Sequence, residues 1–201
     1  MRKAGGVPRI IAGWAGSLTL AAPPNGTRPT SDRVREAMFS ALEARDAIRG
    51  AAVLDLYAGS GALGFEAVSR GAASAVLVDR ADAAGKAMRE NLGRLRRADR
   101  EGSRVDVRIV VKTAGGYLSS LQPEERLGLV FLDPPYDLGG AAVTGDLAAL
   151  VPHLTEDAVV VVERAARSAS PDWPEGLVLD RVRTYGDTAV HLLCPPDRTT
   201  A

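Results

Sequence analysis

The 201-residue sequence lacks several features that would each indicate a particular class of protein. It contains a single cysteine, Cys194, which excludes an internal disulfide and a cysteine-rich metal site. No uninterrupted apolar run exceeds five residues, as at residues 158–162, and no apolar stretch follows the basic residues near the start. We therefore expect a soluble cytoplasmic protein, with no metal site and no membrane-spanning segment.

An excess of charge of one sign is also missing, because 25 basic residues are balanced by 25 acidic ones. The overall composition therefore does not indicate a nucleic-acid-binding protein. Charge is nevertheless uneven along the chain, since residues 1–36 contain six basic and two acidic residues, a net charge of +4. This segment could contact phosphates or could be an ordinary solvated surface.

The hydrophobic pattern predicts an α/β protein with one sizeable core. Apolar runs with the length of strands occur at residues 52–57, 74–79, 105–110, 127–132 and 158–163. Helical patterns alternate with them at residues 62–70, 81–97, 114–121 and 141–150. Two more strand-like segments, residues 177–182 and 189–193, flank a turn and predict a β-hairpin. The expected fold is Rossmann-like, with a mostly parallel sheet that ends in an antiparallel hairpin and carries helices on both faces.

The first 50 residues predict a small extension that precedes the sheet. Residues 9–20 contain two β-prone pieces around a glycine-bearing turn, which is typical of a small hairpin. Thr30 or Ser31 can cap a helix that continues to about residue 48. Its predicted buried stripe consists of Val34, Met38, Phe39 and Leu42. We expect residues 1–50 to form a hairpin-and-helix extension and residues 51–201 to form the main domain.

A glycine-rich turn follows the first predicted strand of the main domain. Gly59, Gly61 and Gly64 have the G-x-G-x-x-G spacing, which lets backbone approach a bound nucleotide closely. The spacing alone is weak evidence, because many such turns bind nothing. Asp55 lies four residues before the first glycine and makes the interpretation more specific. Its carboxylate would repel a pyrophosphate, which disfavours a dinucleotide as the ligand.

An acidic turn suits a ligand that carries an ammonium or sulfonium group, and S-adenosylmethionine carries both. Its ribose hydroxyls need an acceptor, and Asp79, which ends the next apolar run, lies where that acceptor belongs. The alternative for Asp55 is a structural role in which it caps its own turn.

Asp133, Pro134, Pro135 and Tyr136 follow the predicted strand at residues 127–132 directly. Ligands of open α/β sheets bind at the carboxyl ends of the strands, so this segment should face the glycine turn. The two prolines remove N–H donors and leave carbonyls and a carboxylate as acceptors. Asp133 and the Pro134 carbonyl could hold the amino hydrogens of a base while Tyr136 stacks on its ring. The alternative is a proline-rich turn with a packed tyrosine.

Such acceptors have a chemical purpose. The lone pair of an aromatic amine is delocalised into its ring, so the amine is a poor nucleophile until hydrogen bonds to its protons help to localise that pair. Positioning for in-line attack on a methyl donor then supplies much of the rate.

The sequence resembles the RsmD-type 16S rRNA guanine-N2 methyltransferases, a branch of the class I S-adenosylmethionine-dependent enzymes. The resemblance extends over nearly the whole chain and rests on residues 9–13, 28–36, 54–64, 69–72 and 133–136. The block at residues 28–36, Arg-Pro-Thr-Ser-Asp-Arg-Val-Arg-Glu, is its most specific part. The resemblance implies methylation of a guanine N2 amine in 16S rRNA on an assembling small subunit. We expect a monomer that contacts the RNA through residues 1–50.

The expected site combines the residues that these patterns indicate with those that the resemblance implies. The catalytic residues are Asp133, Pro134, Pro135 and Tyr136. The cofactor-binding residues are Asp55, Tyr57, Ala58, Gly59, Ser60, Gly61, Asp79, Arg80, Thr113 and Ala114. The RNA-binding residues are Arg9, Arg28, Thr30, Arg33 and Arg35, for some of which a surface salt bridge to Asp32 or Glu36 is the alternative.

Two positions depart from the family pattern. Many class I methyltransferases carry an acidic or amide residue after the third strand to bind the adenine amino group, whereas residues 111–114 read Val-Lys-Thr-Ala here. Leu132 replaces the alanine that often precedes the Asp-Pro-Pro-Tyr segment, a change between apolar residues.

Three other functions share part of this pattern. An N6-adenine DNA methyltransferase would use both motifs but usually has an added target-recognition region. A nicotinamide-dependent dehydrogenase would use the glycines and has no need of the segment at residues 133–136. A noncatalytic RNA-binding assembly factor would keep the basic N-terminal segment without needing Asp133.

Overall fold

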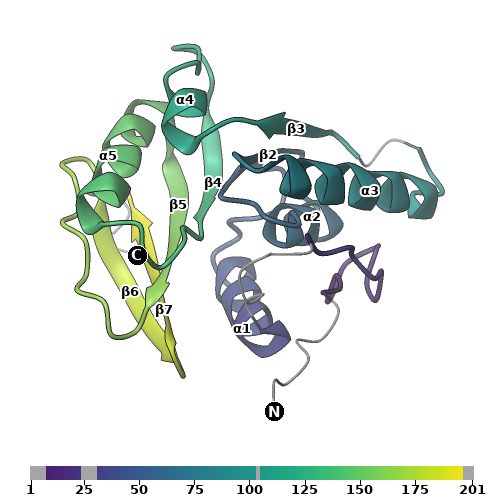
Figure 1. Cartoon of the computed structure of the whole chain (residues 1–201), viewed down its shortest axis with the longest axis horizontal. Helices are drawn as coiled ribbons and strands as arrows, with labels where there is room; N and C mark the ends of the chain where they lie inside the picture. Colours follow the sequence, from purple (N-terminus) through teal and green to yellow (C-terminus); the bar gives the residue numbers. More distant parts are fainter. Residues whose placement is uncertain (1–7, 24–30, 103–104, 197–201) are drawn as a thin grey trace.

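The computed structural model describes residues 8–23, 31–102 and 105–196, which form a seven-stranded sheet with helices on both faces (Figure 1). The strand order is β3-β2-β1-β4-β5-β7-β6. Strands β1 to β5 are parallel, whereas β7 is antiparallel to both β5 and β6. The predicted architecture is therefore confirmed. The strands are β1 Ala52–Leu56, β2 Ser74–Asp79, β3 Val107–Val111, β4 Leu127–Leu132, β5 Leu154–Ala165, β6 Val178–Tyr185 and β7 Thr188–Cys194.

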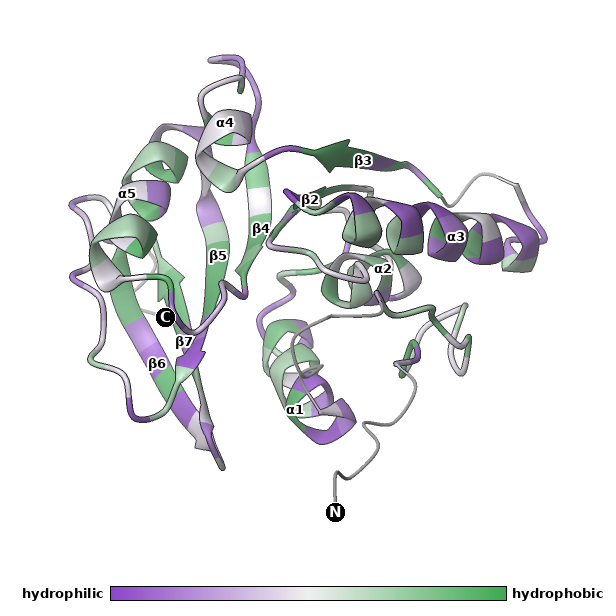
Figure 2. Ribbon diagram, viewed as in Figure 1, coloured by the Kyte–Doolittle hydropathy of each residue, from purple (hydrophilic) through white to green (hydrophobic). Residues whose placement is uncertain are grey.

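The sheet divides the apolar core into two layers, and helices cover each layer. Helices α1, α2 and α3 pack with Phe131 and Val161 on one face. Helices α4 and α5 pack with Val130 and Val160 on the other. Figure 2 shows hydrophilic residues along the exposed side of α3 and along β6. The helices are α1 Asp32–Glu43, α2 Ala62–Ser69, α3 Asp82–Ala98, α4 Ala114–Leu118, α5 Gly140–Leu150 and the 3-10 helix η1 Val151–His153.

The strand order reverses between β1 and β4. The chain continues from β1 to β2 and β3 on one side, and then returns to place β4 on the other side of β1. Leu56 at the end of β1 pairs with Leu132 at the end of β4. The loops that follow these strands therefore leave the sheet side by side, which is the position where open α/β sheets bind ligands.

The predicted first helix begins as expected and ends early. The Ser31 hydroxyl accepts a hydrogen bond from the Val34 N–H and caps α1, whereas Thr30 lies outside the described residues. The helix ends at Glu43, because Ala44 already donates to carbonyls as a C-cap, so the expected end near residue 48 was wrong. The predicted buried stripe is confirmed, since Val34, Met38, Phe39 and Leu42 are all buried.

The strand predicted at residues 158–163 was too short, and the hairpin predicted at residues 9–20 was too long. Strand β5 has 12 residues, because parallel pairing with β4 begins at Leu154 and antiparallel pairing with β7 continues to Ala165. Arg164, which lies just beyond the strand predicted at residues 158–163, is only 5% exposed. The expected hairpin at residues 9–20 is reduced to one antiparallel bridge between Arg9 and Thr19.

The described N-terminal segment, residues 8–23, folds back on itself through backbone hydrogen bonds such as Ile10 to Leu18, and further hydrogen bonds hold it against α2. The fully buried Glu66 accepts from the backbone N–H groups of Ile11 at 2.6 Å and Ala12 at 3.0 Å. Arg70 donates to the same carboxylate at 2.7 Å. Because Gly13 has no side chain, the segment can lie against the Ser69 carbonyl, which a Cβ would approach to 1.9 Å.

We expect Glu66→Ala to lower the free energy of unfolding by about 3–5 kcal/mol, since it strands two buried N–H donors and a buried guanidinium. Urea denaturation measures this change. Glu43→Ala is the matched control, because Glu43 also binds Arg70 but its side chain is 52% exposed. The control should cost about 0–1 kcal/mol. Equal losses for the two variants would contradict this role of Glu66.

Candidate active site

A cavity of about 260 Å³ lies at the point where the strand order reverses. Five of its lining residues are predicted cofactor-binding residues, namely Tyr57, Asp79, Arg80, Thr113 and Ala114. Pro135 from the segment after β4 lines it as well, so the structure brings the two predicted motifs to one cavity. Sequence reasoning missed the other lining residues, which are Val78, Lys112, Gly115, Asp137 and Leu138.

The glycine turn lies at the edge of this cavity and begins α2. Gly61 is the N-cap of α2 and has a φ of 78°, a left-handed conformation that glycine adopts without strain. A Cβ at Gly64 would lie 2.1 Å from the Leu77 side chain, so the absence of a side chain lets α2 pack on β2. The predicted residues Ala58, Ser60 and Gly61 shape the turn but are not among the lining residues of the cavity.

Asp79 fixes the turn from the end of β2. Its carboxylate accepts from the Gly59 N–H at 2.9 Å and from the Ala81 N–H at 2.8 Å. Each carboxylate oxygen has a further lone pair, which remains available to a ligand hydroxyl in the cavity. Asp79 can therefore hold both the loop and a ribose.

Asp55 lies beneath the cavity and is only 1% exposed. It accepts from the Gly64 N–H at 2.9 Å, which is the contact expected if Asp55 caps its own turn. Burial, opposed by this hydrogen bond and reinforced by the charges of Asp133 and Asp79, raises the pKa of Asp55 to about 8. At neutral pH Asp55 is therefore mostly protonated and uncharged, so the negative charge at this edge of the sheet comes from Asp79 and Asp133. The cavity lining itself carries two carboxylates, Asp79 and Asp137, and two cations, Arg80 and Lys112. Asp55 does not line the cavity and holds the glycine turn through the Gly64 N–H.

Tyr57 adopts an unusual conformation between β1 and the glycine turn. Its φ is 64°, which is uncommon and strained for a residue with a large side chain. The Tyr57 hydroxyl donates to the Asp146 carboxylate on α5 at 2.5 Å. Burial and this neighbouring carboxylate raise the pKa of Tyr57. Asp146 was missed, although it is the only charged residue of α5 and so could have been singled out.

The segment after β4 presents its aromatic ring to solvent. Tyr136 is 55% exposed and adjoins Pro135 in the cavity wall, which leaves its ring accessible for stacking. The backbone after Tyr136 is held by a side chain of β5, because the buried Arg164 donates from Nη2 to the Leu138 carbonyl at 2.9 Å. Arg164 was missed because its sequence context predicted a loop.

Asn91 connects the N-terminal segment to the glycine turn. This buried residue of α3 donates to the Ser60 carbonyl at 2.9 Å and exchanges hydrogen bonds with the backbone of Ala21. The turn and residues 8–23 therefore share one support. No pattern in the sequence pointed to Asn91, because an asparagine on an amphipathic helix is usually solvated.

The predicted RNA-binding arginines have different surroundings. Arg9 donates to Asp32 at 3.0 Å, and Arg35 donates to Asp32 at 2.7 Å and to the Arg9 carbonyl at 2.7 Å. Although partial burial acts to raise it, these partners lower the pKa of Asp32. Arg33 is exposed, whereas Arg28 and Thr30 lie outside the described residues.

Arg35 does not lie on the surface where an RNA contact was expected. It is 2% exposed, so its guanidinium belongs to the packing under α1 rather than to an open phosphate site. The salt bridge to Asp32, the alternative to an RNA contact, is present. The Nε and Nη1 atoms of Arg35 have no hydrogen-bond partner in the described part of the chain.

Neither a metal centre nor a membrane-spanning helix occurs within the described ranges. They contain no group of three or more His, Cys, Asp and Glu side chains arranged to hold a metal ion. They also contain no helix with both the length and the apolar character needed to cross a membrane.

The reversed strand order, the glycine turn and the cavity beside them define a class I methyltransferase, a class that uses S-adenosylmethionine. The family model described as "Conserved hypothetical protein 95" matches residues 8–194, and the chain belongs to this family. It is 35% identical over 185 residues to Ribosomal RNA small subunit methyltransferase D of Escherichia coli strain K12, covering 92% of this chain and 88% of that protein. The protein of the same name from Haemophilus influenzae is 30% identical over 188 residues, with 93% of each chain covered.

Solved structures show the same similarity. The Escherichia coli protein yhhF superposes with a TM-score of 0.78 at 34% identity, over 94% of this chain and 98% of that chain. The hypothetical protein TTHA0928 of Thermus thermophilus gives a TM-score of 0.76 at 31% identity, over 92% of this chain and 97% of that chain.

The buried carboxyl of Asp55 predicts a pH dependence of stability. Its pKa of about 8 in the folded protein exceeds the ordinary value of 3.8, so the folded state binds this proton more tightly. The resulting stabilisation is complete below about pH 4 and is lost as the pH rises to about 8. Asp55→Asn should remove this dependence and flatten the fall in stability by up to about 1.4 kcal/mol per pH unit.

Urea unfolding of both proteins between pH 5 and 9 measures the difference in slope. The exposed Asp172→Asn variant is the control and should follow the wild type. Parallel profiles for the wild type and Asp55→Asn would contradict the protonated state of Asp55.

Proposed function

We propose that this protein transfers a methyl group from S-adenosylmethionine to the exocyclic N2 amine of a guanine in 16S rRNA. The observation that carries the proposal is that Pro135, within the acceptor-rich segment at residues 133–136, lines the cavity where the strand order reverses. The relatives named as small-subunit rRNA methyltransferases support rRNA as the substrate class.

The cavity suits the cofactor. S-adenosylmethionine supplies a methyl group on a sulfonium sulfur, and the negative charges of Asp79 and Asp133 favour that cation. Asp79 would accept from the ribose hydroxyls. Backbone can approach a ligand at Gly59 and Gly115, where a Cβ would meet nothing within 4 Å.

The adenine of the cofactor would be bound by residues that follow β3 and Tyr136. Thr113 uses its hydroxyl to cap α4, accepting from the Gly116 N–H at 3.1 Å, so it does not replace the missing acidic or amide residue. Asp137 places a carboxylate on the cavity wall near Ala114 and Gly115. We assign the adenine amino group to Asp137.

The target base is recognised by the segment after β4. Asp133 and the Pro134 carbonyl accept hydrogen bonds from the amino protons, which localises the nitrogen lone pair for attack on the methyl carbon. Tyr136, whose ring is exposed, stacks on the base. The N–C bond would form as the S–C bond breaks, so that the sulfur leaves as a neutral thioether and the proton that the amine loses passes to solvent.

The N-terminal extension, residues 1–50, contacts the RNA in this proposal. Arg9 and Arg33 are exposed and can bind phosphates, and Arg28 and Thr30 belong to the same sequence block. Arg35 supports them from inside through the Arg9 carbonyl. The protein would act as a monomer in the cytoplasm, on an assembling small subunit.

The proposal is tested by incubating the protein with S-adenosylmethionine and 16S rRNA, either as a transcript or in small-subunit particles that lack the modification. Digestion to nucleosides and mass spectrometry identify the product. We expect N2-methylguanosine in the RNA. Methylation of adenine N6 in DNA would instead support the alternative enzyme, and methylation of neither would leave the assembly-factor alternative.

We expect Asp79→Ala to weaken the binding of S-adenosylhomocysteine by about 1–3 kcal/mol, because the ribose and the Gly59 N–H both lose a charged acceptor. Isothermal titration calorimetry measures the affinity. Asp82→Ala, an exposed change in the first turn of α3, is the control and should leave binding unchanged. Tight binding of NAD without binding of S-adenosylhomocysteine would overturn the cofactor assignment.

We expect Asp133→Ala to lower kcat by about 100- to 1000-fold while the affinity for S-adenosylmethionine changes little, because this acceptor acts on the attacking amine. Single-turnover methyl transfer to the RNA measures the effect. Tyr136→Ala should lower activity as well, and Tyr136→Phe much less, since stacking needs the ring. Methyl transfer at nearly the wild-type rate by Asp133→Ala would remove Asp133 from this role.

A further inference from the structure

A groove lies between α1 and the β6–β7 hairpin, away from the cofactor cavity. One part is a cavity of about 320 Å³. A neighbouring cavity of about 410 Å³ shares Thr184 and Tyr185 with it, so the two form one continuous depression, which we call the α1–β6 groove. Its lining comprises Ser31, Arg33, Val34, Ala37, Met38, Ala41, Arg181, Arg183, Thr184, Tyr185, Gly186, Val190 and Leu192.

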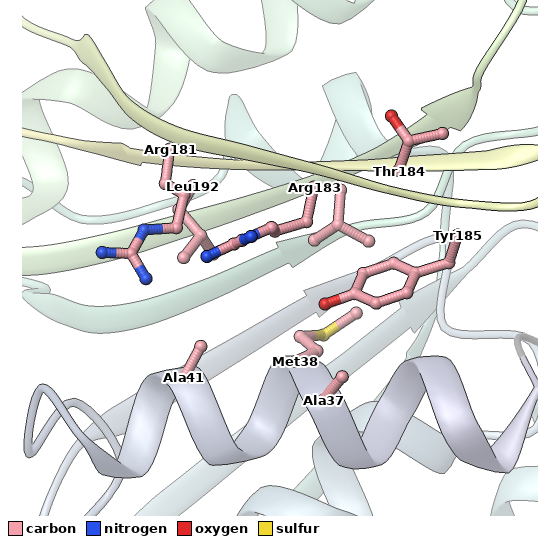
Figure 3. A pocket seen from close by; sticks show the side chains of 9 residues that line it. Ala37, Met38, Ala41, Arg181, Arg183, Thr184, Tyr185 and Leu192 are labelled. Atoms are coloured by element: carbon pink, nitrogen blue, oxygen red, sulfur yellow. The ribbon is translucent and has the colours of Figure 1, made fainter.

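The groove exists because small side chains face large ones across it. Helix α1 contributes Ala37 and Ala41, which leave space above the helix. Strand β6 contributes Arg181, Arg183 and Tyr185, which alternate along the strand and therefore point to one face of the sheet. Figure 3 shows these three side chains extending into the space between the hairpin and α1.

The described lining of the groove carries positive charge that no carboxylate in that lining neutralises. Arg33, Arg181 and Arg183 line it, and no carboxylate occurs among its described lining residues. The nearby carboxylate of Asp180 is paired with Arg45, a contact that joins the end of α1 to β6. The side chains of Arg181 and Arg183 form no salt bridge or hydrogen bond within the described part of the chain, although the backbone of both pairs with β7.

One end of the groove opens at the catalytic edge of the sheet. Leu132, which precedes the catalytic segment, pairs with Val162 of β5. The hairpin continues beyond that level, because Thr188 pairs with both Ala165 and Tyr185, three residues further along β5. From Tyr185 to Arg181 the groove then extends over four residues of β6, about 13 Å at about 3.3 Å per residue.

We propose that the α1–β6 groove binds a single-stranded segment of the substrate RNA that adjoins the target nucleotide. This inference rests on the proposed function, since it takes RNA as the substrate. Arg181 and Arg183 bind consecutive phosphates along β6, and Arg33 binds the chain where it enters from the catalytic edge. The positive lining and the extended shape match a polyanionic strand.

Two structural roles for the arginines of β6 fit the groove less well. Charged side chains on an edge strand can prevent strand pairing between molecules, but these two point to the face of the sheet and not along its edge. Arginine stems can also cover apolar surface, here Met38 and Leu192, but the space that Ala37 and Ala41 leave above α1 is unfilled.

The test compares Arg181→Gln/Arg183→Gln with a matched control, Arg96→Gln/Arg97→Gln, which removes two exposed arginines from the end of α3. Binding to a 16S rRNA transcript is measured at several salt concentrations. The groove variant should bind about 10- to 100-fold more weakly at about 0.1 M salt. Its plot of log affinity against log salt should be flatter by about 1.4, which is two phosphate contacts to a single strand. The control should match the wild type.

Three further measurements make the result specific. Binding of S-adenosylhomocysteine should be unchanged in the groove variant, which also shows that the variant is folded. Arg181→Lys/Arg183→Lys should retain most of the RNA affinity, because it keeps both charges. A defect seen with ribosomal particles but not with the naked transcript would indicate a protein occupant and overturn the proposal.

Failure of this inference is distinguishable from failure of the proposed function. If the wild type methylates the RNA and the groove variant binds with unchanged affinity and salt dependence, the groove proposal alone is overturned. If the wild type binds the transcript through the groove without methylating it, the proposed function fails and the groove remains. If the wild type neither binds nor methylates the RNA, as a transcript or in small-subunit particles, both are overturned.

Discussion

Parallel pairing of β1 with β2 on one side and β4 on the other is the constraint on which the site depends. Because Leu56 pairs with both Val78 and Leu132, the chain segments after three strands must leave the sheet at one edge. The glycine turn, Asp79 and the segment at residues 133–136 meet there without any direct sequence relation. Their carboxylates then lie close enough for Asp79 and Asp133 to raise the pKa of Asp55.

Buried polar side chains convert this coarse placement into fixed loops. Asp79 and Asn91 hold the glycine turn, and Arg164 holds the backbone after Tyr136. Glu66 accepts hydrogen bonds from the backbone of the N-terminal segment and so holds that segment against α2. Each group satisfies backbone donors or acceptors that have no strand or helix partner, so removal of the side chain affects a whole loop. The strained φ of Tyr57 is supported in the same way, by its bond to Asp146.

The elements and the two motifs could be predicted because they depend on local pattern. Apolar periodicity marks each strand and helix of the sheet, and the acidic and proline-rich segments follow strands directly. The supporting residues could not be predicted, because their partners are far away in the sequence. Asn91 binds Ala21 across 70 positions, and Glu66 binds Ile11 across 55. A polar residue on a helix face gives no sign of such a partner.

Arg35 shows the same limit for a residue that was predicted to bind RNA and is buried. A basic cluster predicts a phosphate site, yet burial decides which of its members face solvent, and burial depends on tertiary packing. Arg33 and Arg35 are two positions apart on a helix and so point in different directions, one outward and one into the packing under α1. Charge counts along the sequence cannot separate them.

The balanced composition conceals a separation of charge that a reaction with RNA requires. The carboxylates of Asp79 and Asp133 lie at the ends of β2 and β4, where they favour a sulfonium cation. Arginines line the groove at β6 and the start of α1, and β6 is three strands away from β4 in the sheet. A polyanion is therefore attracted to a surface that lies three strands from the catalytic segment. A net charge of zero over the whole chain is the sum of these two local fields, so it carries no information against a nucleic-acid substrate.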